Sequence, residues 1–310
     1  MVILAGSLGF LLTLFQFQED GIVSLWPINE DQAEKCRQLE AKAWIAGRDL
    51  HESTIVRSEA QIWVNHVEDC PQSPYVLIEA AKREVLSWMP IPAGVESRQD
   101  TDKFSRKFKR SRSKALAWLS AAAIELNRSQ KMVTVPLHFW RARSLLALGE
   151  YPSAKVELLH AQKFEDVPRW RIDRCMALVH LFEGQLDLAL ELGYRSLNHA
   201  VQSDRSLSKY VLGMIVERMG DPDGARQIMN EVMEQDRGRV VFRIFQTLLP
   251  VHERIWLLAY AYSLASTEPS VAVRMWKAYL ARPANEVMDR QRAELYLKNL
   301  AQLPTSSTNN

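Results

Sequence analysis

Three glycines recur along the middle of the chain at nearly equal intervals, and each has the same small residues around it. Gly149 is followed by Gly184 after 35 residues and by Gly220 after a further 36. An alanine stands five residues after each glycine, and another small residue stands seven residues before it. These positions are Ala142, Ala154, Ala177, Ala189, Gly213 and Ala225. Small residues let two helices cross closely and glycine permits a tight turn, so the spacing predicts three consecutive helix hairpins.

The pattern resembles the tetratricopeptide repeat, a helix-turn-helix unit of about 34 residues. The resemblance covers residues 134–235. It implies an all-α fold, a right-handed superhelical solenoid of stacked hairpins over residues 134–285. The sequence departs from the family where the usual aromatic of the first helix is replaced by His138, Asp173 and Lys209, and where the terminal proline is missing or shifted.

The end of the chain extends this arrangement. A degenerate fourth copy is expected from Pro250 through Ala261, Ala272 and Trp276 to Pro283. Apolar residues at helical spacing over 286–303 predict a capping helix, which a solenoid needs to cover its last hydrophobic face. The polar residues 304–310 are expected to be disordered.

The first part of the chain divides into three segments of different character. Residues 1–18 are hydrophobic, residues 19–95 form an irregular helical region that could hold degenerate repeats, and residues 96–133 form a loop and a basic helix. Within the irregular region the apolar spacing predicts amphipathic helices over 30–46, 53–68 and 73–88.

The hydrophobic segment favours a location at a membrane. No charged residue occurs between Met1 and Phe17, and the first lysine is Lys35. The open alternatives are a membrane anchor or atypical export signal, a buried helix, or a misplaced start codon. The residues from Pro71 to Tyr75 also resemble an inter-repeat junction of bacterial envelope tetratricopeptide proteins. We therefore expect a membrane-associated or periplasmic protein, or a cytoplasmic one if the segment is a buried helix.

The cysteines do not form a metal motif or a recognisable disulfide framework. Cys36, Cys70 and Cys175 are widely spaced, with no CxxC and no Cys/His cluster. Three small buried side chains are one interpretation. If the chain is exported, a bridge between Cys36 and Cys70 is conceivable, because both lie in the same predicted helical region.

Catalytic signatures are nearly absent, which favours a non-catalytic protein without a cofactor or a metal. The tetrad from Ser111 to Lys114 fits an S-x-x-K pattern, but it stands in a run rich in Ser, Arg and Lys and its partner motifs are missing. No phosphate-binding glycine loop, nucleophile elbow or zincin motif occurs. An enzyme with a site built from dispersed residues stays open, because one sequence cannot expose such a site.

Seven basic residues gather in a short run, although the formal charge of the whole chain is only +2. They are Lys103, Arg106, Lys107, Lys109, Arg110, Arg112 and Lys114. A solvated face of an ordinary helix is one interpretation, because Phe104, Phe108 and Leu119 continue an apolar stripe through the run. Anionic lipid or an acidic partner is the functional alternative, and nucleic acid is the weakest one, since no recognition motif accompanies the run.

The family resemblance also implies a binding groove, lined by the first helix of each hairpin. In the register of the glycines, the partner-binding residues are Phe139, Arg143, Arg171, Arg174, Tyr210, Met214 and Glu217. This basic and aromatic set suits an extended or helical partner segment, and arginine favours an acidic one or a free carboxyl terminus. Alternatively, the arginines are solvated or pair with neighbouring carboxylates.

The sequence therefore predicts a non-catalytic interaction scaffold or assembly factor that holds a partner protein in this groove. The alternatives are a lipid- or nucleic-acid-binding adaptor that acts through residues 103–114, and the enzyme described above. If the groove binds the partner, the double substitution Arg171→Glu with Arg174→Glu should abolish binding while leaving helicity and melting temperature nearly unchanged.

Overall fold

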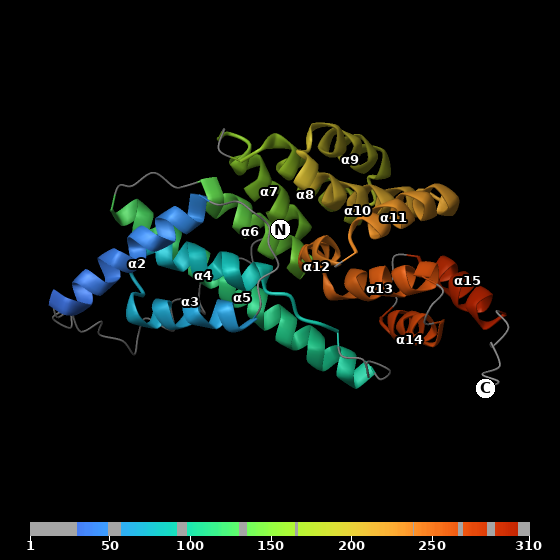
Figure 1. Cartoon of the computed structure of the whole chain (residues 1–310), viewed down its shortest axis with the longest axis horizontal. Helices are drawn as coiled ribbons and strands as arrows, with labels where there is room; N and C mark the ends of the chain where they lie inside the picture. Colours follow the sequence, from blue (N-terminus) through green and yellow to red (C-terminus); the bar gives the residue numbers. More distant parts are fainter. Residues whose placement is uncertain are drawn as a thin grey trace, which may run out of the picture.

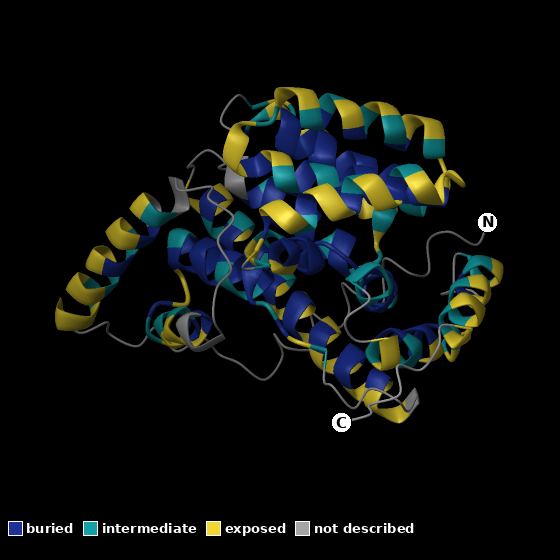
Figure 2. Ribbon diagram, turned by 45° about the vertical axis from the view of Figure 1, so that its right-hand side comes forward, coloured by how far each residue is buried: buried dark blue, intermediate teal, exposed yellow. Residues whose placement is uncertain are grey.

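The regular elements of the protein are α-helices that pack in consecutive pairs (Figure 1). A computed structural model describes residues 30–48, 57–91, 98–129, 135–164, 167–237, 239–265, 269–283 and 289–302. Over these ranges the expected all-α class is confirmed. Burial is greatest where helices meet at the centre, and the outer helices keep one exposed face (Figure 2).

The irregular region folds into three helices, α2 (Glu30–Arg48), α3 (Arg57–Asp69) and α4 (Pro74–Leu86). The start of helix α4 is capped by its own sequence. The Ser73 side chain accepts a hydrogen bond from the Val76 N–H, and Pro74 occupies the first turn. Both α2 and α3 pack against α4, which is buried along most of its length. The three predicted amphipathic helices are therefore present, and α4 is their common core.

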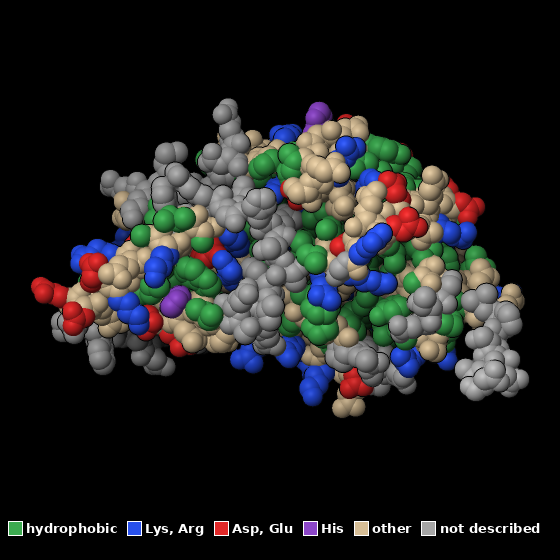
Figure 3. All heavy atoms as spheres, viewed as in Figure 1, with side chains coloured by type: hydrophobic (Ala, Val, Ile, Leu, Met, Phe, Trp, Pro, Cys, Tyr) green, Lys and Arg blue, Asp and Glu red, His purple; other side chains and the backbone are tan. Residues whose placement is uncertain are grey.

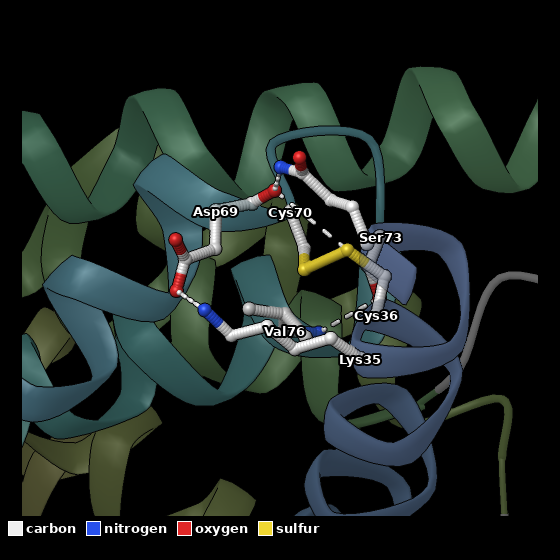
Figure 4. The surroundings of a disulfide bond; sticks show 7 residues. Lys35, Cys36, Asp69, Cys70, Ser73 and Val76 are labelled. Carbon is white, nitrogen blue, oxygen red and sulfur yellow. Dashed lines mark hydrogen bonds and ion pairs between the residues drawn. A yellow bond between two sulfur atoms is a disulfide. The ribbon is translucent and has the colours of Figure 1, made fainter. Parts of the chain in front are cut away.

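A disulfide bond joins Cys36 of α2 to Cys70, at the junction of α3 and α4 (Figure 4). The bridge that the sequence left as conceivable is thus formed in the structure. Beside it, Lys35 Nζ makes an ion pair of 2.8 Å with the Asp69 carboxylate. The disulfide fixes α2 to the rest of the helical region, and Cys175 is free and buried.

Loss of this bridge is expected to lower the free energy of unfolding by about 3–4 kcal/mol, because the bridge restrains a long loop of the unfolded chain. Its two cysteines are separated by 34 residues. Denaturant unfolding of the Cys36→Ser, Cys70→Ser variant would measure the change. Adding a reductant should reproduce the loss in the wild type and have no effect on the variant. A wild type that is equally stable with and without reductant would contradict the prediction.

Helix α5 (Arg98–Arg128) spans the predicted basic segment and connects the first helices to the repeats. It packs against α4 on one side and against α6 on the other. The apolar stripe expected from the sequence is confirmed, since its members are buried: Phe104, Phe108, Ala115, Leu119 and Ala122.

Three hairpins follow, as the glycine spacing predicts. Their helices are α6 (Val135–Leu148) with α7 (Tyr151–Ala161), α8 (Arg169–Phe182) with α9 (Leu186–His199), and α10 (Gln202–Arg218) with α11 (Pro222–Gln235). Each turn contains one of the glycines at a positive φ, with Gly149 at 86°, Gly184 at 77° and Gly220 at 95°. Glycine adopts this conformation at little cost, so it sets the turn between the two helices.

The small residues lie where the helices of each hairpin cross. All five alanines of the pattern are at most 1% exposed: Ala142, Ala154, Ala177, Ala189 and Ala225. At Gly213, an added Cβ would stand only 3.1 Å from the Met229 side chain. The close crossing therefore requires small residues, and the expected solenoid of tetratricopeptide-like hairpins is confirmed.

A fourth hairpin and a cap complete the structure. Helix α13 (Val251–Ala265) pairs with α14 (Pro269–Leu280), and α15 (Arg290–Ala301) packs against α14. These match the degenerate fourth copy and the capping helix. The short helix α12 (Val240–Thr247), which the repeat pattern does not predict, separates the third hairpin from the fourth. Asp236 starts it by accepting hydrogen bonds from the N–H groups of Val241 and Phe242.

None of the helices in the described ranges is long and apolar enough to cross a bilayer. The segment 1–18, to which the anchor or export prediction refers, lies outside the described residues, and so does the tail 304–310.

Candidate functional site

The seven residues expected to line a groove lie on the first helices of the three hairpins, and all of them are buried. Helices α6 and α10 both contact α8 between them, which brings the seven residues onto one continuous face. None is more than 5% exposed: Phe139, Arg143, Arg171, Arg174, Tyr210, Met214 and Glu217. This face, called the concave face below, is therefore an internal contact surface in this structure, and partner binding at it stays a prediction.

On α6, Arg143 connects the concave face to α12. Its guanidinium lies 4.9 Å from the ring centre of Trp140 and 5.8 Å from that of Phe139. The Arg143 Nη2 group also donates a hydrogen bond of 3.4 Å to Thr247 Oγ1 in α12. Cation–π contact and a hydrogen bond thus compensate part of the cost of burying this charge.

On α8, the arginines meet an internal carboxylate. Arg171 Nη2 donates to Asp204 Oδ2 at 3.1 Å, and Arg174 Nη1 lies 4.0 Å from Asp204 Oδ1. Both guanidinium groups also lie beside the Trp170 ring. The alternative interpretation, in which these arginines pair with a neighbouring carboxylate, is the one that the structure shows. Charge reversal at these two positions would therefore change the core, so from the structure we expect a loss of stability where the sequence alone predicts none.

On α10, Tyr210 is covered by α12. Its ring lies 5.6 Å from Phe245 in a stacked arrangement and 5.4 Å from Phe242. The Tyr210 hydroxyl donates to Asp236 Oδ2 at 3.3 Å, the same carboxylate that begins α12. Burial and the negative charge of Asp236 raise the pKa of Tyr210, so its hydroxyl keeps its proton as a donor.

At the end of α10, Glu217 is covered by α15. Arg292 lies 3.2 Å from Glu217 Oε1, and the Tyr296 hydroxyl donates to the same oxygen at 3.3 Å. Burial raises the pKa of Glu217, while Arg218 and Arg292 act in the opposite direction. The capping helix therefore closes one end of the concave face through polar contacts as well as through apolar ones.

Sequence reasoning missed α12, although the sequence carries a signal for it. The segment from Val240 to Phe245 is mostly apolar, and it falls between two repeat units without belonging to either. An apolar segment outside the repeat register has to cover some hydrophobic face, and here it covers α10 and α4.

The basic run behaves differently from the concave face, because most of it is exposed. Six of its side chains point to solvent along α5: Lys103, Arg106, Lys107, Lys109, Arg110 and Lys114. Within the described part of the chain, the first five make no ion pair or hydrogen bond, and Lys114 lies 4.6 Å from the Trp118 ring centre. We call these six residues the basic face. Lys and Arg side chains project from the lower edge of the molecule, where α5 runs (Figure 3).

Arg112 does not belong to the basic face, which corrects the assignment from the sequence. Its side chain is fully buried, 4.5 Å from the Phe108 ring centre, and Nη1 donates to the Glu84 carbonyl at 2.5 Å. Arg254 of α13 lies 4.8 Å from the same ring. Burial lowers the pKa of Arg112 to about 10 and that of Arg254 to about 9. Position 112 falls on the apolar stripe of α5, which carries it into the core.

Among the residues that the structure describes, no group of three or more His, Cys, Asp or Glu side chains is arranged to hold a metal ion.

No protein-family model matches the chain, and no curated protein sequence matches it. A solved structure with similarity to it is that of YrrB, described as a TPR protein with an unusual peptide-binding site. The two chains are 15% identical, with a TM-score of 0.36, and the match covers 77% of this chain and 99% of that one.

Proposed function

We propose that the protein is a non-catalytic interaction scaffold whose accessible binding surface is the basic face of α5. The observation that carries the proposal is the contrast between two sets of arginines and lysines. Those of the concave face are buried and meet groups of the same chain, whereas five on α5 are exposed without a partner in the described residues. A rigid helix of 31 residues holds them in a fixed row.

The partner that fits this surface is an acidic protein segment. Exposed cations on one helix face attract a chain of carboxylates at long range and give fast, salt-dependent association. Anionic lipid and nucleic acid are the competing ligands of such a surface. Since the cations are spaced along one helix, a segment of Asp and Glu residues lying beside α5 would meet them in turn.

The disulfide supports the envelope location as part of this proposal. Such bonds persist in oxidising compartments and are rare in the cytosol. The bridge between Cys36 and Cys70 is consistent with a protein exported from the cytosol. This covalent bond between α2 and the junction of α3 and α4 would then keep the first helices folded outside the cell's reducing environment.

The test compares two triple variants that each remove three exposed positive charges. The first variant changes Lys103, Lys107 and Arg110 to glutamine. The control changes three exposed residues of other helices to glutamine: Lys42, Arg205 and Lys298. Fluorescence anisotropy with a labelled peptide rich in Asp and Glu measures binding at low and high salt. We expect the first variant to bind about tenfold more weakly at low salt and the control to bind within about twofold of the wild type.

Equal binding by the wild type and the first variant would remove the basic face as the binding surface. The concave face would then be the surface to test, with α12 as the element that has to leave. Stronger binding of anionic vesicles or duplex DNA than of the acidic peptide would replace the protein partner by that ligand.

A further inference from the structure

One exposed side of α5 carries residues at the spacing of a surface that pairs with another helix. Positions 103, 107, 110, 114, 117, 121, 124 and 128 follow one another in alternating steps of four and three. Since the mean step of 3.5 residues is close to one helical turn, these positions lie on one side of the helix. We call this set the α5 stripe: Lys103, Lys107, Arg110, Lys114, Ala117, Ala121, Ile124 and Arg128.

The α5 stripe is accessible and lies apart from the side of α5 that joins the core. All of its residues are exposed except Ala121, which is half-buried, and Ile124 is 65% exposed. The side that packs against α4 and α6 contains other residues, among them Phe108, Ala115 and Leu119, which are fully buried. Contacts within the described ranges therefore leave the stripe open to a partner.

The chemistry of the α5 stripe changes along the helix. Its first part, over residues 103–114, consists of four cations of the basic face. Its second part contains Ala117, Ala121 and Ile124. Alanine lets another helix approach closely, and Ile124 offers apolar surface that burial would remove from water. The Trp118 ring, whose centre lies 4.6 Å from Lys114 Nζ, borders the stripe where the two parts meet.

A second copy of this chain does not complement the α5 stripe. Two such helices in the same direction would place the cations of one against the cations of the other. In opposite directions, a pairing centred on Ala121 would bring Lys114 of one copy to Arg128 of the other. Because neither arrangement supplies carboxylates, the complementary helix belongs to a different protein.

We propose that the α5 stripe binds one amphipathic helix of a partner protein. That helix carries carboxylates opposite residues 103–114 and small or aliphatic side chains opposite residues 117–124. The inference rests on the proposed function, which assigns an acidic segment to the basic face, and it adds that this segment is helical. The spacing continues through both parts, so a helix of the same spacing can pair over about 38 Å. The apolar contact sets the register, which a row of similar cations leaves open.

The test uses labelled helical peptides of roughly four heptads, with Glu at the first pairing positions and Leu at the later ones. A second peptide has the two blocks in reverse order, so both helix directions are covered. In the variant Ala117→Gln with Ile124→Gln, the apolar part is lost, every charge remains, and glutamine preserves the helix. Fluorescence anisotropy should show about tenfold weaker binding of the better peptide.

The control is Val156→Gln with Leu188→Gln, which replaces exposed apolar residues of α7 and α9. It should bind the same peptide to within about twofold of the wild type. Thermal unfolding of both variants verifies their fold. Carbon chemical shifts of the isotope-labelled peptide should report a helix in the complex.

The Ala117 and Ile124 variant keeps the whole basic face, so it should still bind the peptide rich in Asp and Glu like the wild type. Failure of the helix-docking inference is thereby distinguished from failure of the proposed function. Equal binding of the amphipathic peptide by this variant and the wild type, or a bound peptide without helix, would overturn the inference. A dimer of the wild type in sedimentation, absent in the variant, would also overturn it, because the occupant would then be a second copy.

Discussion

Replacing both Arg171 and Arg174 with glutamate is expected to unfold the repeats. The two guanidinium groups are buried beside Asp204, at 3.1 and 4.0 Å from its carboxylate oxygens. The double change would bury two new carboxylates next to that of Asp204. It would also remove the two cations that now lie beside Asp204. Since breaking a single buried pair costs about 3–5 kcal/mol, the double change should exceed that loss and approach the stability of a whole domain.

Circular dichroism during thermal unfolding measures the effect. The matched control carries Arg205→Glu with Arg226→Glu, two reversals of the same kind at exposed positions of α10 and α11. The control should keep the melting temperature of the wild type to within a few degrees, since exposed charges contribute little. A double Arg171 and Arg174 variant that melts with the control would show that these side chains are not buried in solution.

Replacing Arg218 with methionine should also destabilise the protein strongly, by about 3–5 kcal/mol. Arg218 Nη2 lies 2.8 Å from Glu253 Oε2, and its guanidinium lies 4.5 Å from the Trp256 ring centre. These contacts join the third hairpin to the fourth across the position where α12 interrupts the repeat. Methionine fills the space of the side chain but leaves the Glu253 carboxylate buried without its main cation.

The double variant Arg218→Met with Glu253→Leu separates the contribution of the ion pair with Glu253 from that of packing against Trp256. Because it removes both charges together, it should recover most of the stability that the single change loses. Urea unfolding of the wild type, both single variants and the double variant completes the cycle. If the double variant loses the sum of the two single losses, the ion pair contributes nothing and packing against Trp256 carries the effect.

The hairpins could be predicted from the sequence because their determinants are local. Gly149, Gly184 and Gly220 set the turns, and the small residues set the crossings a few positions away. Such constraints leave a fixed spacing in the chain. The cap α15 could be predicted for a similar reason, since the last apolar face of a stack has to be covered.

The burial of the concave face could not be predicted from the sequence, because it depends on contacts between distant segments of the chain. Arg143 meets Thr247 across 104 residues, and Arg292 meets Glu217 across 75. No periodicity encodes such pairs. Arg112 illustrates the same limit at one position: charge density suggested a surface residue, while its place on the apolar stripe of α5 decided its burial. Disulfide pairing likewise required the fold that brings Cys36 to Cys70.

Helix α12 has a consequence for any molecule that would bind the concave face. It is tethered to that face by short connections, from Asp236 to Val240 on one side and from Leu248 to Pro250 on the other. A segment held this way has an effective local concentration on the order of millimolar. A segment of another protein would have to compete with α12 for this face. The apparent affinity of that segment would be reduced by a factor equal to the local concentration of α12 divided by the intrinsic dissociation constant of α12. Selectivity at this face would therefore be set as much by an internal competitor as by the partner's own contacts.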